Sequence, residues 1–292
     1  MRRRALLAAL LSLTACAGVP EHAVRQQTAD SLARQAGWQP VSLGTRTFNL
    51  AAWASPSRGA LLTVYIEGDG LAWITAQSPS DDPTPLDPVG LRMAVAQPTG
   101  AVAYLARPCQ YSGLSDARCQ QGYWTGERFS EPVITASNDA IDQLKQRVGA
   151  RRVLLVGYSG GGAVATLLAQ RRHDVVALVT VAGNVDPVGW THLHRVTPLA
   201  GSLDPMAARE RLTHLPQWHF VGSRDSNMPA SLAQGFVQGQ PAARVVVVDG
   251  FEHHCCWARD WPKLVAPVLR AVGKISDEAY PPLPGQASLP EM

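Results

Sequence analysis

Short apolar runs alternate along the chain with longer stretches in which apolar residues recur every three or four positions. The short runs are typical of buried strands, and the periodic stretches are typical of helices. The predicted strands are Leu61–Ile66, Ala101–Ala106, Val153–Val156, Val175–Val181, Trp218–Val221 and Val245–Val248. The predicted helices are Ala29–Ala36, Glu131–Arg147, Gly161–Arg171, Pro229–Gln238 and Asp260–Val272. This alternation predicts an α/β fold, with a mostly parallel sheet and helices on both faces.

Three longer stretches lack either pattern. Residues 77–90 carry repeated proline and aspartate, residues 107–130 hold two cysteines and several aromatic residues, and residues 183–205 show no clear period. Proline, glycine and aspartate favour turns over helices and strands. We therefore expect loops in all three stretches.

One strand ends in an unusual glycine-rich turn. Residues 157–162 read Gly-Tyr-Ser-Gly-Gly-Gly, directly between the strand Val153–Val156 and the next helix. A Gly-x-Ser-x-Gly sequence between a strand and a helix is the pattern of a nucleophile elbow, in which Ser159 stands exposed on a sharp turn. A phosphate-binding loop is excluded because no Lys-Ser/Thr pair follows the glycines, and Gly68-x-Gly70 lacks the third glycine of a dinucleotide site.

A serine nucleophile needs a base and an acid that orients the base. Asp225 follows the strand Trp218–Val221, and His253 follows the last predicted strand, so both come after Ser159 in the order Ser, Asp, His. His254 is the alternative base, and Asp186 is the alternative acid, one strand earlier. Asp249, which precedes a glycine, fits a turn residue better.

With these three positions in place, residues 60–272 resemble the α/β-hydrolase superfamily. The resemblance implies an oxyanion hole with two backbone donors. One is the amide of Gly160, and the other comes from the Glu67-Gly68-Asp69-Gly70 loop, at Asp69 or Gly70. Members of the superfamily commonly have His-Gly at this loop, whereas this chain has Glu67. Because a carboxylate disfavours a neighbouring oxyanion, we expect Asp69 to turn its side chain away from it.

The first residues resemble a bacterial lipoprotein signal. Three arginines, Arg2 to Arg4, precede a short apolar run that ends Leu13-Thr14-Ala15-Cys16. The run is too short for a permanent membrane span, and the small residues before Cys16 predict cleavage and lipid attachment there. Ala17 in place of aspartate predicts, by this resemblance, an outer-membrane lipoprotein that faces the periplasm.

This interpretation divides the chain into four parts. A signal peptide covers residues 1–15, a mature leader 16–40, the hydrolase domain 41–275 and a proline-rich tail 276–292.

Export to an oxidising compartment favours disulfides among the remaining cysteines. Cys109 and Cys119 lie ten residues apart, so a local bridge is favoured, while Cys255 and Cys256 are adjacent. A bridge between adjacent cysteines is strained, so cross-pairing with the 109–119 loop is the alternative. The spacing of cysteines and histidines matches no zinc motif, and we expect neither a metal nor a cofactor.

Composition narrows the class of protein further. The chain has 292 residues, of which 46% are hydrophobic and 17% charged, with a formal net charge of +3. This composition predicts a buried core and argues against disorder, and the absence of a dense basic run after the N-terminus argues against a nucleic-acid partner. No long apolar run follows the N-terminal segment, so no internal transmembrane helix is expected.

Together these features predict a lipid-anchored serine hydrolase that cleaves a small-molecule or lipid-like ester, as a carboxylesterase or lipase does. Ser159 is the expected nucleophile, His253 the base and Asp225 the orienting acid. The alternatives are a non-catalytic binding lipoprotein on the same scaffold, and a peptidase or amidase.

Overall fold

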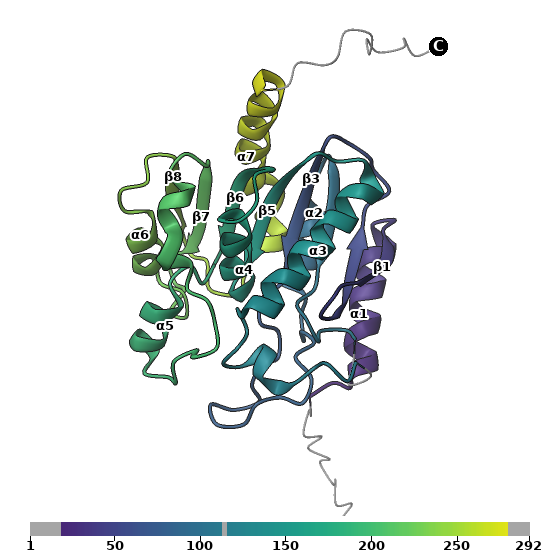
Figure 1. The fold of residues 1–292 in the computed structure, drawn as a ribbon, viewed down its shortest axis with the longest axis vertical. Helices are drawn as coiled ribbons and strands as arrows, with labels where there is room; N and C mark the ends of the chain where they lie inside the picture. The colour runs from purple at the N-terminus through teal and green to yellow at the C-terminus, as the bar shows by residue number, and fades with distance from the viewer. Residues whose placement is uncertain (1–18, 113–115, 280–292) are drawn as a thin grey trace, which may run out of the picture.

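The computed structural model describes residues 19–112 and 116–279. The strands that it describes form one sheet, in the order β1-β2-β4-β3-β5-β6-β7-β8 (Figure 1). The strands are β1 Gln39–Gly44, β2 Asn49–Ala54, β3 Leu61–Ile66, β4 Ala101–Leu105, β5 Arg152–Tyr158, β6 Val175–Val181, β7 Gln217–Gly222 and β8 Ala243–Val248. Neighbours from β4 to β8 pair in parallel, and β1 and β2 add an antiparallel edge. The predicted mostly parallel sheet is confirmed.

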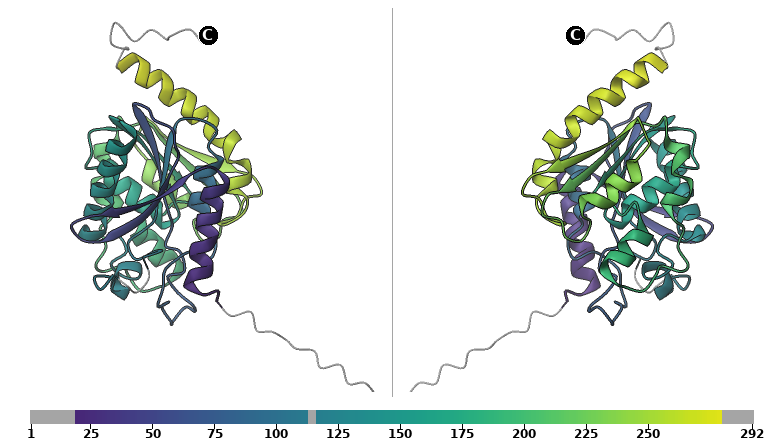
Figure 2. Two further views of the ribbon diagram at one scale, coloured as in Figure 1. Left: turned by 90° about the vertical axis from the view of Figure 1, so that its right-hand side faces the viewer. Right: turned by 90° about the vertical axis from the view of Figure 1, so that its left-hand side faces the viewer.

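Helices cover both faces of this sheet (Figure 2). The α-helices are α1 His22–Gln35, α2 Val89–Ala96, α3 Glu131–Val148, α4 Gly160–Ala169, α5 Pro187–His194, α6 Ala230–Val237 and α7 Trp257–Ala279, and the 3₁₀ helices are η2 Gln121–Trp124 and η3 Pro205–Leu212. Helices α3, α4 and α6 pack on one face, while α1, α2 and α7 pack on the other. No helix in the described part of the chain is both long and apolar enough to cross a bilayer.

The central strands are buried on both sides, which explains their continuous apolar runs. Every residue of β6 is buried, and its side chains alternate between the two hydrophobic layers: Leu178 faces the α3–α4 side and Val179 the α7 side. Helices on both faces of a parallel sheet remove the polar alternation seen in half-exposed strands. The buried parallel strands β3 to β7 were therefore the easiest elements to predict.

The N-terminal part was harder to predict. Helix α1 is longer than the predicted Ala29–Ala36, and it packs Ala29 and Ala33 into the core. The two antiparallel strands β1 and β2 were not predicted, because β1 lies at the sheet edge and has mostly polar or half-exposed positions. The segment expected as a leader is thus integrated into the domain from His22 onward.

Two further helices lie where loops were expected. Helix α2 begins after Pro88, and helix α5 begins at Pro187, where the side chain of Asp186 accepts a hydrogen bond from the Gly189 amide at 2.8 Å. Both helices have only eight residues, so neither shows a clear period in the sequence. The predictions of loops at 77–90 and 183–205 are wrong for these parts.

The last helix also differs from its predicted bounds. Helix α7 runs from Trp257 to Ala279, although it contains Pro262 and Pro267. Residues 276–279, predicted as the start of a proline-rich tail, therefore belong to this helix, and residues 280–292 lie outside the described residues. The predicted signal peptide and the predicted lipidation site Cys16 lie outside them too.

Candidate active site

Ser159 occupies a strained turn between β5 and α4. Its backbone has φ 49° and ψ −122°, in a region that residues with a side chain rarely adopt. The turn is possible because the backbone packs closely around it: a side-chain carbon on Gly157 would collide with the Gly161 carbonyl group, and one on Gly161 with the carbonyl oxygens of Ile66 and Glu67. The glycines on either side of Ser159 are thus required by contacts, as the motif predicts.

The structure brings the three predicted catalytic residues together. Ser159 Oγ lies 3.0 Å from His253 Nε2, and His253 Nδ1 lies 2.9 Å from Asp225 Oδ2. The three side chains follow β5, β7 and β8, whose carboxyl ends meet at one edge of the sheet. With Nδ1 donating to the carboxylate, Nε2 is free to accept the proton of the Ser159 hydroxyl group.

Asp225 is held in the orientation that this contact requires. Its Oδ1 accepts hydrogen bonds from the backbone amides of Asn227 and Met228, at 2.9 and 2.8 Å, and its Oδ2 faces His253. Burial by itself raises the pKa of Asp225, but the hydrogen bond and charge of His253 and the two amides outweigh burial and lower it overall. Asp225 is therefore a carboxylate at neutral pH, able to orient an imidazole.

The alternative residues have other partners. His254 Nδ1 lies 2.9 Å from the hydroxyl group of Tyr158, and burial, followed by the charge of His253, lowers the pKa of His254. Asp186 caps helix α5, and Asp249 accepts a hydrogen bond from Ser223 Oγ at 3.1 Å. The geometry thus favours His253 and Asp225.

The loop at residues 67–70 lies against the serine turn. The Cα of Gly68 faces Ser159 and Tyr158, so that a side-chain carbon there would come within 3.1 Å of Ser159 Cβ. Gly70 has a positive φ of 63° and faces Pro83 and Gln110 instead. Of the residues in this loop, Glu67, Gly68 and Asp69 therefore lie against the turn, and Gly70 does not.

The sequence predicts that Asp69 turns its side chain away from the oxyanion, but the structure places its carboxylate beside the turn. It packs against Gly160, and a side-chain carbon on Gly160 would collide with it. Two arginines hold it there: Arg128 Nη1 lies 2.6 Å from Oδ2, and Arg107 Nη1 lies 3.2 Å from Oδ1. Burial alone would raise the pKa of Asp69, but the charges of Arg128 and Arg107 lower it. The arginines offset the negative charge that would otherwise oppose an oxyanion.

Glu67 stands where related proteins commonly have histidine, and it is buried in the protein. Its side chain accepts hydrogen bonds from the amides of Gly68, at 2.9 Å, and Gly90, at 3.1 Å, so it ties the loop to the first turn of α2. Burial raises the pKa of Glu67 to about 7, although these amides lower it in part. The carboxyl group thus changes its charge close to neutral pH.

Arg107 and Arg128 were not expected at the site. Both side chains are buried, and they come from the long segment 107–130, which the sequence presents as a polar loop. Arginine is rarely buried without a partner. Only the folded chain shows that their partner is Asp69, 38 and 59 residues away.

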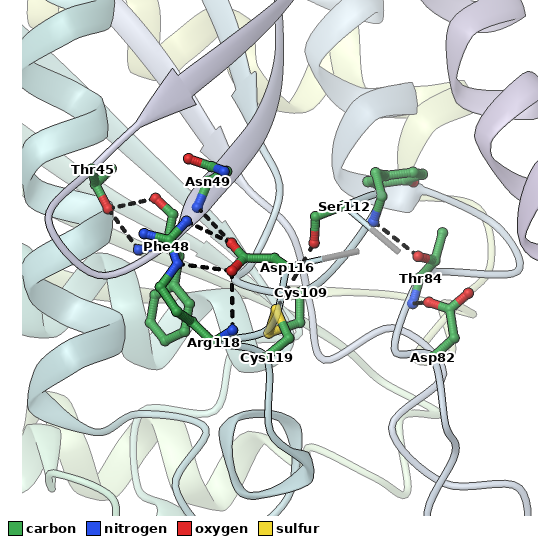
Figure 3. The surroundings of a disulfide bond; sticks show 11 residues. Thr45, Phe48, Asn49, Asp82, Thr84, Cys109, Ser112, Asp116, Arg118 and Cys119 are labelled. Carbon is green, nitrogen blue, oxygen red and sulfur yellow. Dashed lines mark hydrogen bonds and ion pairs between the residues drawn. A yellow bond between two sulfur atoms is a disulfide. The ribbon is translucent and has the colours of Figure 1, made fainter. Parts of the chain in front are cut away.

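A disulfide closes the segment that supplies these arginines. Cys109 and Cys119 are bonded, with their Cα atoms 5.5 Å apart, which matches the predicted pairing. Figure 3 shows the neighbourhood: Asp116 pairs with Arg118 and accepts a hydrogen bond from the Asn49 amide at 3.1 Å. The bridge thus fastens the segment beside the turn between β1 and β2.

The sulfur atoms of Cys255 and Cys256 are also paired with each other. Cross-pairing with the 109–119 loop, the alternative from the sequence, is not what the structure contains. This adjacent pair lies directly after His253 and His254 and before α7. Among the described residues, no group of three or more histidine, cysteine, aspartate or glutamate side chains is placed to hold a metal ion.

The fold and the geometry around Ser159 are those of an α/β hydrolase. The chain belongs to the alpha/beta hydrolase family, whose model matches residues 106–290, well over half of the chain. No curated protein matches the sequence significantly.

Solved structures with the same fold include several esterases. Est1E from Butyrivibrio proteoclasticus is 12% identical, with a TM-score of 0.59 over 80% of this chain and 99% of Est1E. The hydrolase GrgF from Penicillium sp. sh18 is 11% identical, with a TM-score of 0.58 over 81% and 98% of the two chains. An esterase from Pyrococcus furiosus is 12% identical, with a TM-score of 0.52 over 84% and 93%. At these identities the likeness shows the fold alone.

Proposed function

We propose that this protein is a serine hydrolase that cleaves carboxylic esters through an acyl-enzyme. The observation that carries the proposal is the continuous chain of contacts from Ser159 Oγ to His253 to Asp225, at 3.0 and 2.9 Å, on a strained strand-to-helix turn. A serine placed in this way has both a base for its proton and an acid that orients the base.

The chemistry proceeds in two halves. Ser159 Oγ attacks the ester carbonyl carbon while His253 Nε2 takes the hydroxyl proton, and the collapse of the tetrahedral intermediate expels the alcohol, which receives that proton. Water then attacks the acyl-enzyme with His253 again as the base, and the acid product leaves with Ser159 restored. Asp225 stays ionised and stabilises the imidazolium in both halves.

The developing oxyanion requires hydrogen-bond donors. The amide of Gly160 stands at the first position of α4, where the helix dipole adds favourable charge. A second amide comes from the neighbouring 67–70 loop, at Asp69 or Gly70. Asp69 lies closer to the turn than Gly70 and is the better candidate.

We further propose that Cys16 carries the lipid anchor of an outer-membrane lipoprotein. This proposal is supported by the Leu13-Thr14-Ala15-Cys16 sequence after a charged and apolar N-terminal segment. Radioactive palmitate should be incorporated by the exported protein and not by Cys16→Ser. A wild-type protein that takes up no lipid label would overturn the anchor but not the hydrolase.

The catalytic proposal is tested with a fluorophosphonate probe and a short-chain p-nitrophenyl ester. One adduct is expected, on the peptide that holds Ser159, and Ser159→Ala should abolish both the adduct and turnover. His253→Ala should reduce turnover on the order of 10⁴-fold, whereas His254→Ala, its matched neighbour, should keep most of it. Folded wild-type protein that neither labels nor turns over any ester would favour a binding protein on a hydrolase scaffold.

A further inference from the structure

Exposed apolar side chains gather at one end of the molecule, beyond the carboxyl ends of the parallel strands. Helix α5, the loop after β3 and the start of α1 all lie at this end in each view (Figures 1 and 2). In the described part of the chain, the large exposed apolar residues belong to these three segments or directly adjoin them, with Val247 on β8 as the exception. They include Val24, Trp73, Ile74, Val188, Leu193 and Val196. We call this end the apolar end.

Two stretches of the apolar end are also poor in charge. Residues 71–80, which contain Trp73 and Ile74, include no aspartate, glutamate, lysine or arginine. Residues 187–203 include a single one, Arg195. Loops at protein surfaces are usually polar. Two segments that together hold one charged residue and expose Trp, Ile, Leu and Val side chains therefore indicate a surface that is covered by a partner.

The chemistry of these side chains fits a lipid bilayer. Tryptophan prefers the boundary between water and lipid, and exposed aliphatic side chains gain free energy when they leave water for the bilayer. Trp73 pairs with Pro79 across a short isolated bridge, so the loop presents Trp73 and Ile74 on an ordered tip.

The proposed anchor leads to the same end. Cys16 precedes His22, the first residue of α1, by six residues, and α1 begins at the apolar end (Figure 1). Six residues span at most about 20 Å when fully extended. A lipid on Cys16 therefore keeps the start of α1 close to the membrane surface.

We propose that the apolar end docks on a phospholipid bilayer, so that the edge of the sheet that carries Ser159 faces the membrane. The tether depends on the lipid anchor proposed at Cys16, whereas the docking surface itself is formed by residues that the structure describes. Docking in this orientation brings the site to esters held at the lipid surface and thereby sharpens the substrate class of the proposed function.

The tryptophans allow a direct test. Of the eight tryptophans, Trp73 is the exposed one, Trp190 is half-buried and the other six are buried. The full-length exported protein is mixed with vesicles of phosphatidylethanolamine and phosphatidylglycerol that contain a brominated phosphatidylcholine, which quenches only tryptophans in contact with lipid. Quenching is expected for the wild type, and Trp73→Phe should remove most of it.

Two valines give a matched pair. Val188 on α5 is 62% exposed and Val247 on β8 is 53% exposed. Val188→Ser should weaken vesicle binding roughly five-fold, the order expected when part of a valine loses its burial in lipid, and Val247→Ser should leave it unchanged. Turnover of a soluble p-nitrophenyl ester should be the same in all of these variants and shows that they are folded.

Three results would overturn the docking surface. One is wild-type protein that shows no bromine quenching, whether or not it floats with the vesicles, and another is quenching that persists in Trp73→Phe. The third is a dimer in sedimentation equilibrium that Leu193→Ser dissociates, because a second copy then covers this end. Loss of ester turnover with retained quenching would instead contradict the proposed function alone.

Discussion

The turn at residues 157–162 and the loop at residues 67–70 face each other across the site, yet they are held in place in different ways. The turn is shaped by its own glycines, which let backbone atoms pack closely around Ser159. The loop is held by side chains from elsewhere: Arg107 and Arg128 bind Asp69, and Glu67 reaches the amide of Gly90. One half of the site thus depends on local geometry and the other on buried charges.

The difference explains how each half should respond to change. A turn held by close backbone contacts has no room for an added carbon, whereas a loop held by ion pairs loses stability when one charge is removed. Four predictions follow this contrast, from the largest expected effect to the smallest.

Gly161→Ala is expected to abolish ester turnover. Its new side-chain carbon would collide with the carbonyl oxygens of Ile66 and Glu67, so the turn that presents Ser159 must shift. Turnover and fluorophosphonate labelling measure the effect. Gly235→Ala in α6 is the matched control, because open space surrounds that position, and it should stabilise the protein by about 0.5–1 kcal/mol through helix propensity. An active Gly161→Ala enzyme would show that the turn tolerates the change and that the contrast is wrong.

Asp69→Asn should lower the free energy of unfolding by about 3 kcal/mol, because it leaves the buried arginines 107 and 128 without a counter-charge. Urea unfolding at neutral pH measures this loss. The pKa of Asp69 is lower in the folded protein than in the unfolded chain, so its carboxylate stabilises the fold at any pH above the pKa of the unfolded chain. The wild type should therefore lose this contribution as the pH falls and Asp69 takes up a proton.

An exposed ion pair serves as the control for this prediction. Asp139 pairs with Arg46, whose side chain is largely exposed, and Asp139→Asn should cost less than about 1 kcal/mol. If the two variants lose equal stability, the burial of Arg107 and Arg128 has no special importance.

Glu67→Gln should change how stability depends on pH. The folded protein holds a proton on Glu67 up to about pH 7, whereas the unfolded chain releases it at the ordinary value, so wild-type stability falls as the pH rises between these values. The fall amounts to at most about 3 kcal/mol. Unfolding measured from pH 4 to 8 should show that this component disappears in Glu67→Gln, and an unchanged profile would contradict the shifted pKa.

Replacing both Cys109 and Cys119 by serine should have the smallest effect, roughly 2–3 kcal/mol from the entropy of the closed loop. Thermal unfolding measures the loss. Because this bridge holds the segment that supplies Arg107, the double variant combined with Asp69→Asn should lose less than the sum of the two changes. Strict additivity would mean that the bridge and the ion pairs act independently.

The sequence was sufficient for the parts of the site that depend on neighbours in the chain. The strand-glycine-serine-helix pattern predicted the strained turn, and the positions of Asp225 and His253 after buried strands predicted that they would meet Ser159. This worked because parallel strands end at one edge of the sheet, so residues that follow different strands come together without further information.

Other features required the folded chain. The sequence favoured His253 but left His254 as the alternative base, since both residues follow the same strand. The contacts of the two side chains favour His253, which lies 3.0 Å from Ser159, whereas His254 contacts Tyr158. The short helices α2 and α5 and the antiparallel strands β1 and β2 carry too little periodicity to be recognised.

By itself, the sequence determined the α/β class, the parallel strands, the nucleophile turn and the order of the three candidate catalytic residues, because apolar runs and glycine turns act over a few neighbouring residues. The tertiary structure alone decided that Asp69 lies against Gly160 between two buried arginines, and that Glu67 is a buried carboxyl group with a pKa of about 7. The physical reason is that burial and ion pairing depend on which distant segments the fold brings together, and a charge in the sequence does not carry the identity of its partner.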